Sequence, residues 1–182
     1  YIASFTDITE HKAALNRIDH LAHHDMLTDL PNRFTLSEYL KQAINSAQRY
    51  KEKIGVMFID LDRFKTINDT LGHHAGDLLL IEVSRRLKAC VRSSDIVARL
   101  GGDEFVIGLL GSNKIDVISV TEVISFVADK ILHTLRQPYF LDGHEVHSSP
   151  SIGIALFPDD GMIVEDIMKN ADIAMYHAKA KG

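Results

Sequence analysis

The segment that most constrains the fold is the turn Gly101-Gly102-Asp103-Glu104, which separates two apolar and partly β-branched runs at residues 95–100 and 105–110. Runs of this kind predict buried strands. Paired glycines reach the positive φ angles that a short, twisted hairpin requires. We therefore expect a β-hairpin with the two acids at its tip.

Carboxylates at a bend between buried strands need either open solvent or a positive partner. For an isolated Gly-Gly-Asp hairpin, an ordinary solvated turn and a metal site both remain open. A second acidic cluster favours the metal, because residues 54–62 form a nearly continuous apolar run that ends in Asp60-Leu61-Asp62. A central strand has this pattern where its end opens onto a site. Asp60 and Asp62 are expected on one face, with the Leu61 backbone carbonyl on the other edge.

Mg²⁺ prefers hard oxygen ligands, typically one or two carboxylates completed by water and substrate phosphates. Asp60 with Asp103 or Glu104 fits that description. A strand end running into solvent is the alternative for Asp60 and Asp62 taken alone. The two acidic clusters together favour a divalent-metal site.

The residues that follow the acidic strand suit a nucleotide. A strand-to-helix turn at Arg63, Phe64 and Lys65 leaves backbone N–H groups unpaired for a polyphosphate, and Lys65 adds positive charge. Asn68 and Asp77 could read guanine, whose adjacent N1–H and N2–H donors a carboxylate accepts together, whereas adenine has a lone pair at N1. Local capping is the alternative for both residues.

With these motifs in order, the chain from about Asp25 to its end resembles the GGDEF family of diguanylate cyclases. The segments that carry the resemblance are residues 25–33, 58–65, 68–69, 72–73, 76–77, 101–105, 151–155 and 171–179. The resemblance implies an enzyme that condenses two GTP into cyclic di-GMP and pyrophosphate. We expect an α/β fold of the palm or ferredoxin-like kind, with a central antiparallel-type sheet flanked by helices and an N-terminal linker helix.

The resemblance also assigns roles at matching positions. Asp60 and Asp103, helped by the Leu61 carbonyl, are implied to hold Mg²⁺ or Mn²⁺. Glu104 is implied to be either a further metal ligand or the proton acceptor. Asn68 and Asp77 match the guanine-binding pair. The groups that match the phosphate contacts are the backbone amides around Arg63, Phe64 and Lys65, together with Lys179.

The family implies that two domains face each other as a homodimer, each holding one GTP. Catalysis then depends on orientation, because the 3′-hydroxyl of one GTP must attack the α-phosphorus of the other. Arg92 and Asp95 have the spacing of the family's inhibitory site, where cyclic di-GMP binds as product, although surface Arg and Asp pairs are common. The rival function is a catalytically silent domain that binds GTP or cyclic di-GMP and regulates.

Composition agrees with one soluble domain. The chain has 182 residues, 46% of them hydrophobic, and a formal net charge of −5, which argues against a nucleic-acid polymer as partner. No apolar run approaches the length of a membrane span, so we expect no membrane contact by this segment. The lone Cys90 excludes an internal disulfide and favours a reducing, cytoplasmic location, although the parent protein could be membrane-tethered upstream.

The first residues are expected to belong to another unit. Residues 2–5 read as the end of a strand, and residues 7–10 as a helix start, as at the exit of a PAS-type sensor. We expect residues 1–24 to comprise the end of a sensor domain and a connector helix, and residues 25–182 the GGDEF domain. Leu15 and Ile18 recur at helical spacing, so the connector either pairs with its twin or packs as a linker.

Helical periodicity predicts helices around residues 36–47, 79–90, 117–135 and 165–180, with further strands near 139–156. The pairs His23-His24 and His73-His74 are expected in surface or capping roles, because neighbours in sequence point different ways and no partner has zinc spacing. Asp29 stands where the family often has Gly, which is expected to affect only a turn.

Overall fold

The computed structural model describes residues 9–110 and 120–181. Its helices and strands, in chain order, are α1 (Thr9–His23), α2 (Arg33–Tyr50), β1 (Ile54–Leu61), α3 (Phe64–Leu71), α4 (His73–Cys90), β2 (Ile96–Gly101), β3 (Glu104–Leu110), α5 (Val120–Leu135), β4 (Tyr139–Leu141), β5 (His144–Val146), β6 (Pro150–Phe157) and α6 (Val164–Lys181). The main sheet has the order β2-β3-β1-β6, and β4 pairs with β5 separately. Every pairing is antiparallel.

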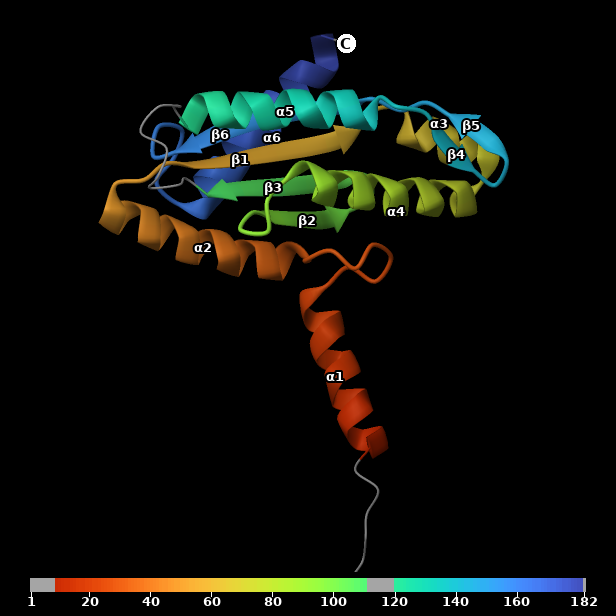
Figure 1. Ribbon diagram of the computed structural model, residues 1–182, viewed down its shortest axis with the longest axis horizontal. Helices are drawn as coiled ribbons and strands as arrows, with labels where there is room; N and C mark the ends of the chain where they lie inside the picture. The colour runs from red at the N-terminus through yellow and green to blue at the C-terminus, as the bar shows by residue number, and fades with distance from the viewer. Residues whose placement is uncertain (1–8, 111–119, 182) are drawn as a thin grey trace, which may run out of the picture.

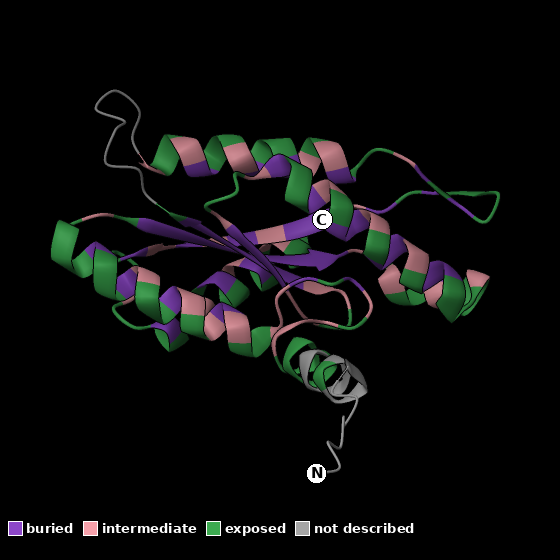
Figure 2. Ribbon diagram, turned by 60° about the horizontal axis from the view of Figure 1, so that its bottom comes forward, coloured by how far each residue is buried: buried purple, intermediate pink, exposed green. Residues whose placement is uncertain are grey.

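The sheet is a central layer between helices (Figure 1). Along β1, Met57 and Ile59 face a core that contains α4 and α5, while Val56 and Phe58 face a second core that contains α2 and α6. This alternation follows from the two-residue period of a strand. Every residue of β1 is buried, as expected for a strand covered on both faces (Figure 2).

The α/β fold with a central antiparallel sheet and flanking helices is confirmed. The hairpin appears as β2 and β3, and the four expected helices appear as α2, α4, α5 and α6. The region near 139–156 contains two three-residue strands, β4 and β5, and the eight-residue strand β6. Residues 1–8 and 111–119, which include the expected strand end and the first residues of the third helix, lie outside the described residues.

Helix α1 projects away from the layered part of the protein (Figure 1). Its last carbonyls are bound by the segment that starts α2, because Asn32 Nδ2 donates to Ala22 O at 2.8 Å and Thr35 Oγ1 donates to His23 O at 2.8 Å. Asn32 also caps α2 by accepting from the Thr35 backbone N–H. Ile18 is 63% exposed, so it does not pack on the domain as a linker would, and the side chain of Leu15 lies outside the described part.

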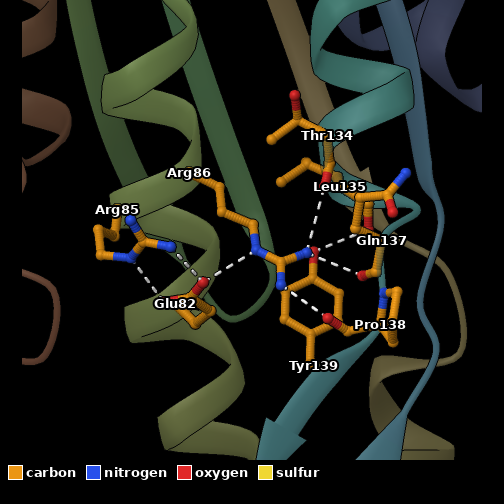
Figure 3. Close-up of polar contacts among 8 residues, drawn as sticks. All are labelled: Glu82, Arg85, Arg86, Thr134, Leu135, Gln137, Pro138 and Tyr139. Carbon is orange, nitrogen blue, oxygen red and sulfur yellow. Dashed lines mark hydrogen bonds and ion pairs between the residues drawn. The ribbon is translucent and has the colours of Figure 1, made fainter.

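The β4–β5 hairpin is attached to α4 by Arg86 (Figure 3). The Arg86 guanidinium donates to the carbonyls at the end of α5 and the start of β4, those of Thr134, Gln137 and Pro138, at 2.7 to 3.1 Å. It also lies 3.9 Å over the ring of Tyr139, which is fully buried. Burial raises the pKa of Tyr139 to about 12, and its hydroxyl donates to Leu135 O. This cluster holds three elements together.

No helix within residues 9–110 and 120–181 is long and apolar enough to cross a membrane.

Candidate active site

A buried acid and a lysine meet at one end of the sheet. Asp60, the second-last residue of β1, is 8% exposed, and Lys179 Nζ on α6 donates to its Oδ1 at 2.5 Å. Helix α6 lies very close to β6, since a Cβ added at Gly153 would lie 2.0 Å from Ala171 O and 2.1 Å from Met175 N. Only glycine permits that approach, which brings Lys179 over the strand end.

The hairpin tip lies next to this pair. Gly101 and Gly102 have φ angles of +140° and +52°, which L-residues rarely adopt. Gly101 pairs with Glu104 across the turn, and Glu104 in turn pairs with Asp60 on β1. The expected hairpin with acids at its tip is therefore present, with Asp103 in the turn and Glu104 opening β3.

The electrostatics of the three acids indicate crowding of negative charge. The pKa of Asp103 is raised, first by burial and then by the charge of Asp60. Burial likewise raises the pKa of Glu104, and the nearby Asp172 and Asp60 add to it while Arg33 opposes it. The hydrogen bond from Lys179 to Asp60 raises the pKa of Lys179. One lysine thus faces several carboxylates, and a donor set of crowded carboxylates suits a divalent cation that prefers hard oxygen ligands.

The side chains of Leu61 and Asp62, at the end of β1, have different surroundings. The Leu61 side chain is buried in the core on the opposite face from Asp60, at the last position of β1. The Asp62 carboxylate accepts from Ser149 Oγ at 2.5 Å and from Ser151 Oγ at 2.8 Å. Asp62 therefore joins the end of β1 to the start of β6.

The nucleotide-reading residues expected after β1 lie on α3 and α4. Arg63 has a φ of +62° and precedes the first turn of α3, whose first backbone N–H groups have no partner within the helix. The Asn68 amide packs against α4, because a Cβ added at Gly76 would lie 1.9 Å from Asn68 Oδ1. Asp77 follows Gly76 on α4, so Asn68 and Asp77 come from the two helices that meet at the α3–α4 junction.

Arg92 and Asp95 lie at the other end of β2 from the acids. The β2 strand runs six residues, so the two sites are separated by about 17 Å along it. Asp95 Oδ2 accepts from the Arg92 backbone N–H at 2.9 Å, and Tyr39 OH donates to Ser94 O at 2.5 Å. Arg92, Asp95, Tyr39 and Lys88 line a pocket of about 490 Å³. Arg92 and Asp95 therefore line one concave surface, and the Asp95 carboxylate is held there by the Arg92 backbone N–H.

Sequence reasoning missed the role of Arg99. Its Nη1 donates to Asp25 Oδ1 at 2.8 Å, and its Nε and Nη2 donate to Gly102 O at 3.1 and 2.7 Å. Burial works to raise the pKa of Asp25, but hydrogen bonds from Thr28 and Arg99 outweigh it, so that pKa is lowered. The sequence does carry one indication of this contact, because Arg99 is a charged residue within an otherwise apolar strand. Arg99 fixes the hairpin turn to the loop that enters the domain.

The comparisons with known proteins agree with this geometry. The family model for the diguanylate cyclase GGDEF domain matches residues 22–182. The chain is 50% identical over 162 residues to MucR of Pseudomonas aeruginosa, named a bifunctional diguanylate cyclase/cyclic di-GMP phosphodiesterase, covering 89% of this chain and 23% of MucR. It is 41% identical over 181 residues to PdeR of Escherichia coli, named a cyclic di-GMP phosphodiesterase, covering 100% of this chain and 26% of PdeR.

A third relative has been solved as an isolated domain. TpbB of Pseudomonas aeruginosa is named a diguanylate cyclase, and it is 44% identical over 161 residues, covering 88% of this chain and 36% of TpbB. The structure of its GGDEF domain alone matches with a TM-score of 0.81 at 42% identity, covering 88% of this chain and 90% of that one. The chain thus spans roughly a quarter to a third of the length of these full relatives. On the strength of the family match and these relatives, the chain belongs to the diguanylate cyclase GGDEF-domain family.

Proposed function

We propose that this chain is a catalytic diguanylate cyclase domain that condenses two GTP into cyclic di-GMP and pyrophosphate. The observation that carries the proposal is the gathering of Asp60, Asp103 and Glu104 at one end of the sheet, with Lys179 bonded to Asp60. Asp60 is buried and the other two acids are partly buried, so gathering their charges costs stability unless a cation neutralises them. A metal-assisted nucleotide reaction provides that cation.

In this proposal each chain binds one GTP through its own residues. Asn68 and Asp77 accept from the guanine edge. The α3 N-terminus, with the amides of Arg63, Phe64 and Lys65, holds the phosphates. When GTP binds, the Lys179 ammonium contacts both Asp60 and a phosphate. Both the strand end and the helix start come from the same β1–α3 connection, so a phosphate at α3 lies beside the acids.

The acidic residues bind the metal ion in this proposal. Asp60, Asp103 and the Leu61 carbonyl hold Mg²⁺ or Mn²⁺, and Glu104 acts either as a further ligand or as the proton acceptor. When bound, the metal lowers the pKa of the attacking 3′-hydroxyl and neutralises charge on the departing pyrophosphate. The 3′-oxygen then forms its bond to the α-phosphorus of the second GTP as the bond to pyrophosphate breaks.

Two further parts complete the proposal. Residues 25–182 form the GGDEF domain, and residues 1–24 end an upstream unit and connect it through α1. Cyclic di-GMP inhibits by binding at Arg92 and Asp95, whose pocket lies away from the acids. Each molecule of cyclic di-GMP is formed by a homodimer. The domain works in the cytoplasm.

The second candidate is a silent domain that binds GTP or cyclic di-GMP and regulates an attached enzyme. It is favoured by one observation, since PdeR is named only for phosphodiesterase activity although it matches along 100% of this chain. The presence of every acid and lysine expected for chemistry favours the cyclase instead.

The test uses the full protein that contains this chain, incubated with GTP and Mg²⁺. Cyclic di-GMP is expected from the wild type and is expected to fall to background in Asp103→Ala and Glu104→Ala. The exposed Asp129 on α5 offers a matched control, because Asp129→Ala removes a carboxylate away from the site and should leave turnover unchanged. A dimeric wild type that binds GTP yet forms no product would establish the silent domain. Arg92→Ala should relieve product inhibition without abolishing turnover.

A further inference from the structure

A cluster of possible metal ligands lies at the C-terminal end of α1, outside the proposed catalytic site. His20 and His24 lie one helical turn apart, and their rings stack with centroids 4.4 Å apart and planes only 6° from parallel. Both rings turn a nitrogen toward Asp29, which lies beyond the helix in the loop that enters the domain. His20 Nε2 is 2.8 Å from Asp29 Oδ1, and His24 Nδ1 is 3.8 Å from the same oxygen.

We propose that His20, His24 and Asp29 form a binding site for Zn²⁺. One ligand atom from each residue lies within 4.8 Å of the others. In a tetrahedral zinc site with bonds near 2.0 Å, neighbouring ligand atoms are about 3.3 Å apart. The two separations from Asp29 Oδ1, 2.8 and 3.8 Å, bracket that value. Imidazole nitrogen with one carboxylate is a donor set that selects zinc over magnesium.

The backbone at Asp29 supports a dedicated role for this residue. Its φ is +57°, a left-handed conformation that favours glycine and in which a β-carbon is strained. The turn itself is held by bonds that need no carboxylate there, because the Asp29 backbone N–H donates to Asp25 O at 2.9 Å. A glycine would therefore suit the turn, and within the described residues the Asp29 carboxylate contacts His20 and His24.

A simple ion pair explains the cluster less well. The side chains of His20 and Asp29 are 51% and 71% exposed, and an ion pair at that exposure contributes little. Zn²⁺ takes both imidazoles in their neutral form, with the carboxylate as a third ligand.

The site would fix α1 to the catalytic domain. His20 comes from α1, His24 directly follows the helix, and Asp29 comes from the loop that Asp25 and Arg99 bond to the hairpin turn. The exposure of the site leaves the fourth position of the metal open to water. Zinc would then stiffen the joint through which α1 meets the layered part of the protein.

Zinc binding to the metal-stripped protein is measured by titration calorimetry in millimolar Mg²⁺, which keeps oxygen sites occupied. One Zn²⁺ per chain is expected, and Co²⁺ in its place should show the visible bands of a tetrahedral site. Affinity should fall about tenfold or more in His20→Gln and in Asp29→Gly. Asp29→Gly is the sharper variant, because it relieves the strained φ and so removes a ligand without harming the fold, which thermal unfolding verifies.

Two controls separate this site from others. His177→Gln removes an exposed helical histidine on α6 and should leave zinc affinity unchanged, as should Asp103→Ala at the catalytic acids. Binding that is absent in the wild type, unchanged in Asp29→Gly, or lost in Asp103→Ala would overturn the proposal. Because the readout is zinc affinity, the result does not depend on cyclase activity.

Discussion

Arg99 joins two segments that lie 74 residues apart in the chain. One end of its planar guanidinium bonds the carboxylate of Asp25, and the other end bonds the backbone carbonyl of Gly102. Lysine cannot reproduce this arrangement, because its ammonium is a single point rather than a fork of donors. The arginine side chain is only 10% exposed, so the donors and acceptors it satisfies have little access to water.

Arg99→Lys should therefore destabilise the protein although it keeps the charge. We expect a loss of about 1–3 kcal/mol in the free energy of unfolding, the cost of leaving partly buried polar groups unpaired. Urea denaturation measures it, and GTP affinity should weaken as the hairpin turn loosens. Arg49→Lys, at an exposed position on α2, is the matched control and should change neither quantity. Equal stability of the two variants would show that Arg99 does not anchor the turn.

Glu82 predicts a pH dependence of stability. Hydrogen bonds from Arg85 and Arg86 lower its pKa from 4.5 to about 2. A carboxylate whose pKa is lowered in the folded state stabilises the fold above its unfolded pKa and loses that contribution as the pH falls through the folded one. Stability should thus decline between about pH 4.5 and pH 2. Since Arg85 is exposed, screening limits the contribution to on the order of 1 kcal/mol.

The measurement compares the wild type with Glu82→Gln. Thermal unfolding across that pH range should show a shallower decline in the variant, and added salt should reduce the difference only in part, because Arg86 is largely buried. Glu38→Gln, which removes the partner of an exposed lysine on α2, serves as control. If the two proteins lose thermal stability in parallel as the pH falls, Glu82 does not cause the acid sensitivity.

At the scale of elements, the close approach of α6 to β6 positions the candidate site. The contact depends on Gly153, where an added Cβ would overlap backbone atoms of α6. Gly108 on β3 is a useful comparison, since a Cβ there would meet only side-chain atoms, Ile96 Cγ2 at 2.9 Å and Leu40 Cδ2 at 3.1 Å. Side chains can rotate away, whereas helix backbone has to move as a whole.

Gly153→Ala is expected to cost more than Gly108→Ala. We expect at least about 2 kcal/mol for the first and below about 1.5 kcal/mol for the second, from the range measured for overpacked cores. Displacing α6 also moves Lys179 away from Asp60, so Gly153→Ala should weaken GTP binding beyond what its stability loss explains. Denaturation and nucleotide titration of both variants provide the measurement. A similar loss in both would mean that α6 adapts without leaving its place.

The elements themselves could be predicted from the sequence, but the contacts between them could not. Local patterns were enough for the β2–β3 hairpin, the buried strand that ends at Asp60, and the amphipathic helices, because each depends on neighbours within a few residues. The bond between Lys179 and Asp60 joins residues 119 positions apart and depends on how closely α6 packs. A family resemblance pointed to Lys179 for phosphate, and that role stays a prediction.

The same limit explains what was missed. Arg86 reads as an exposed helical arginine beside Glu82, and only the fold places carbonyls from the end of α5 within its reach. The cluster of His20, His24 and Asp29 was not predicted, because its members are four and five residues apart rather than adjacent in sequence. His23 contacts Thr35 while His24 contacts Asp29, so such neighbours do diverge as expected. The partner of His24 was four residues back, where a helix brings side chains together.

At the scale of the whole molecule, one chain is too small a unit for the proposed reaction. The residues assigned to guanine and to the metal occur once in the chain, yet cyclic di-GMP contains two guanines and two new phosphodiester bonds. The proposed reaction therefore requires two chains to meet with their acid-bearing ends facing. Helix α1 projects away from the domain and exposes Ile18 and Leu21, at 63% and 41%, as an apolar surface that a second α1 would cover.

The rate of cyclic di-GMP formation should consequently depend on the square of protein concentration while monomers predominate. Halving the concentration should then lower the rate by about fourfold rather than twofold, by mass action. Ile18→Glu puts a charge on the exposed face of α1 without touching the acids, so it should shift the half-maximal concentration upward while leaving the rate at saturating protein unchanged. Initial rates with light scattering on the same samples measure both effects. The opposite outcome is a rate per chain that stays constant while the mass measured by light scattering falls from dimer to monomer. One chain would then complete the product alone. The assignment of a single GTP to each chain would be wrong.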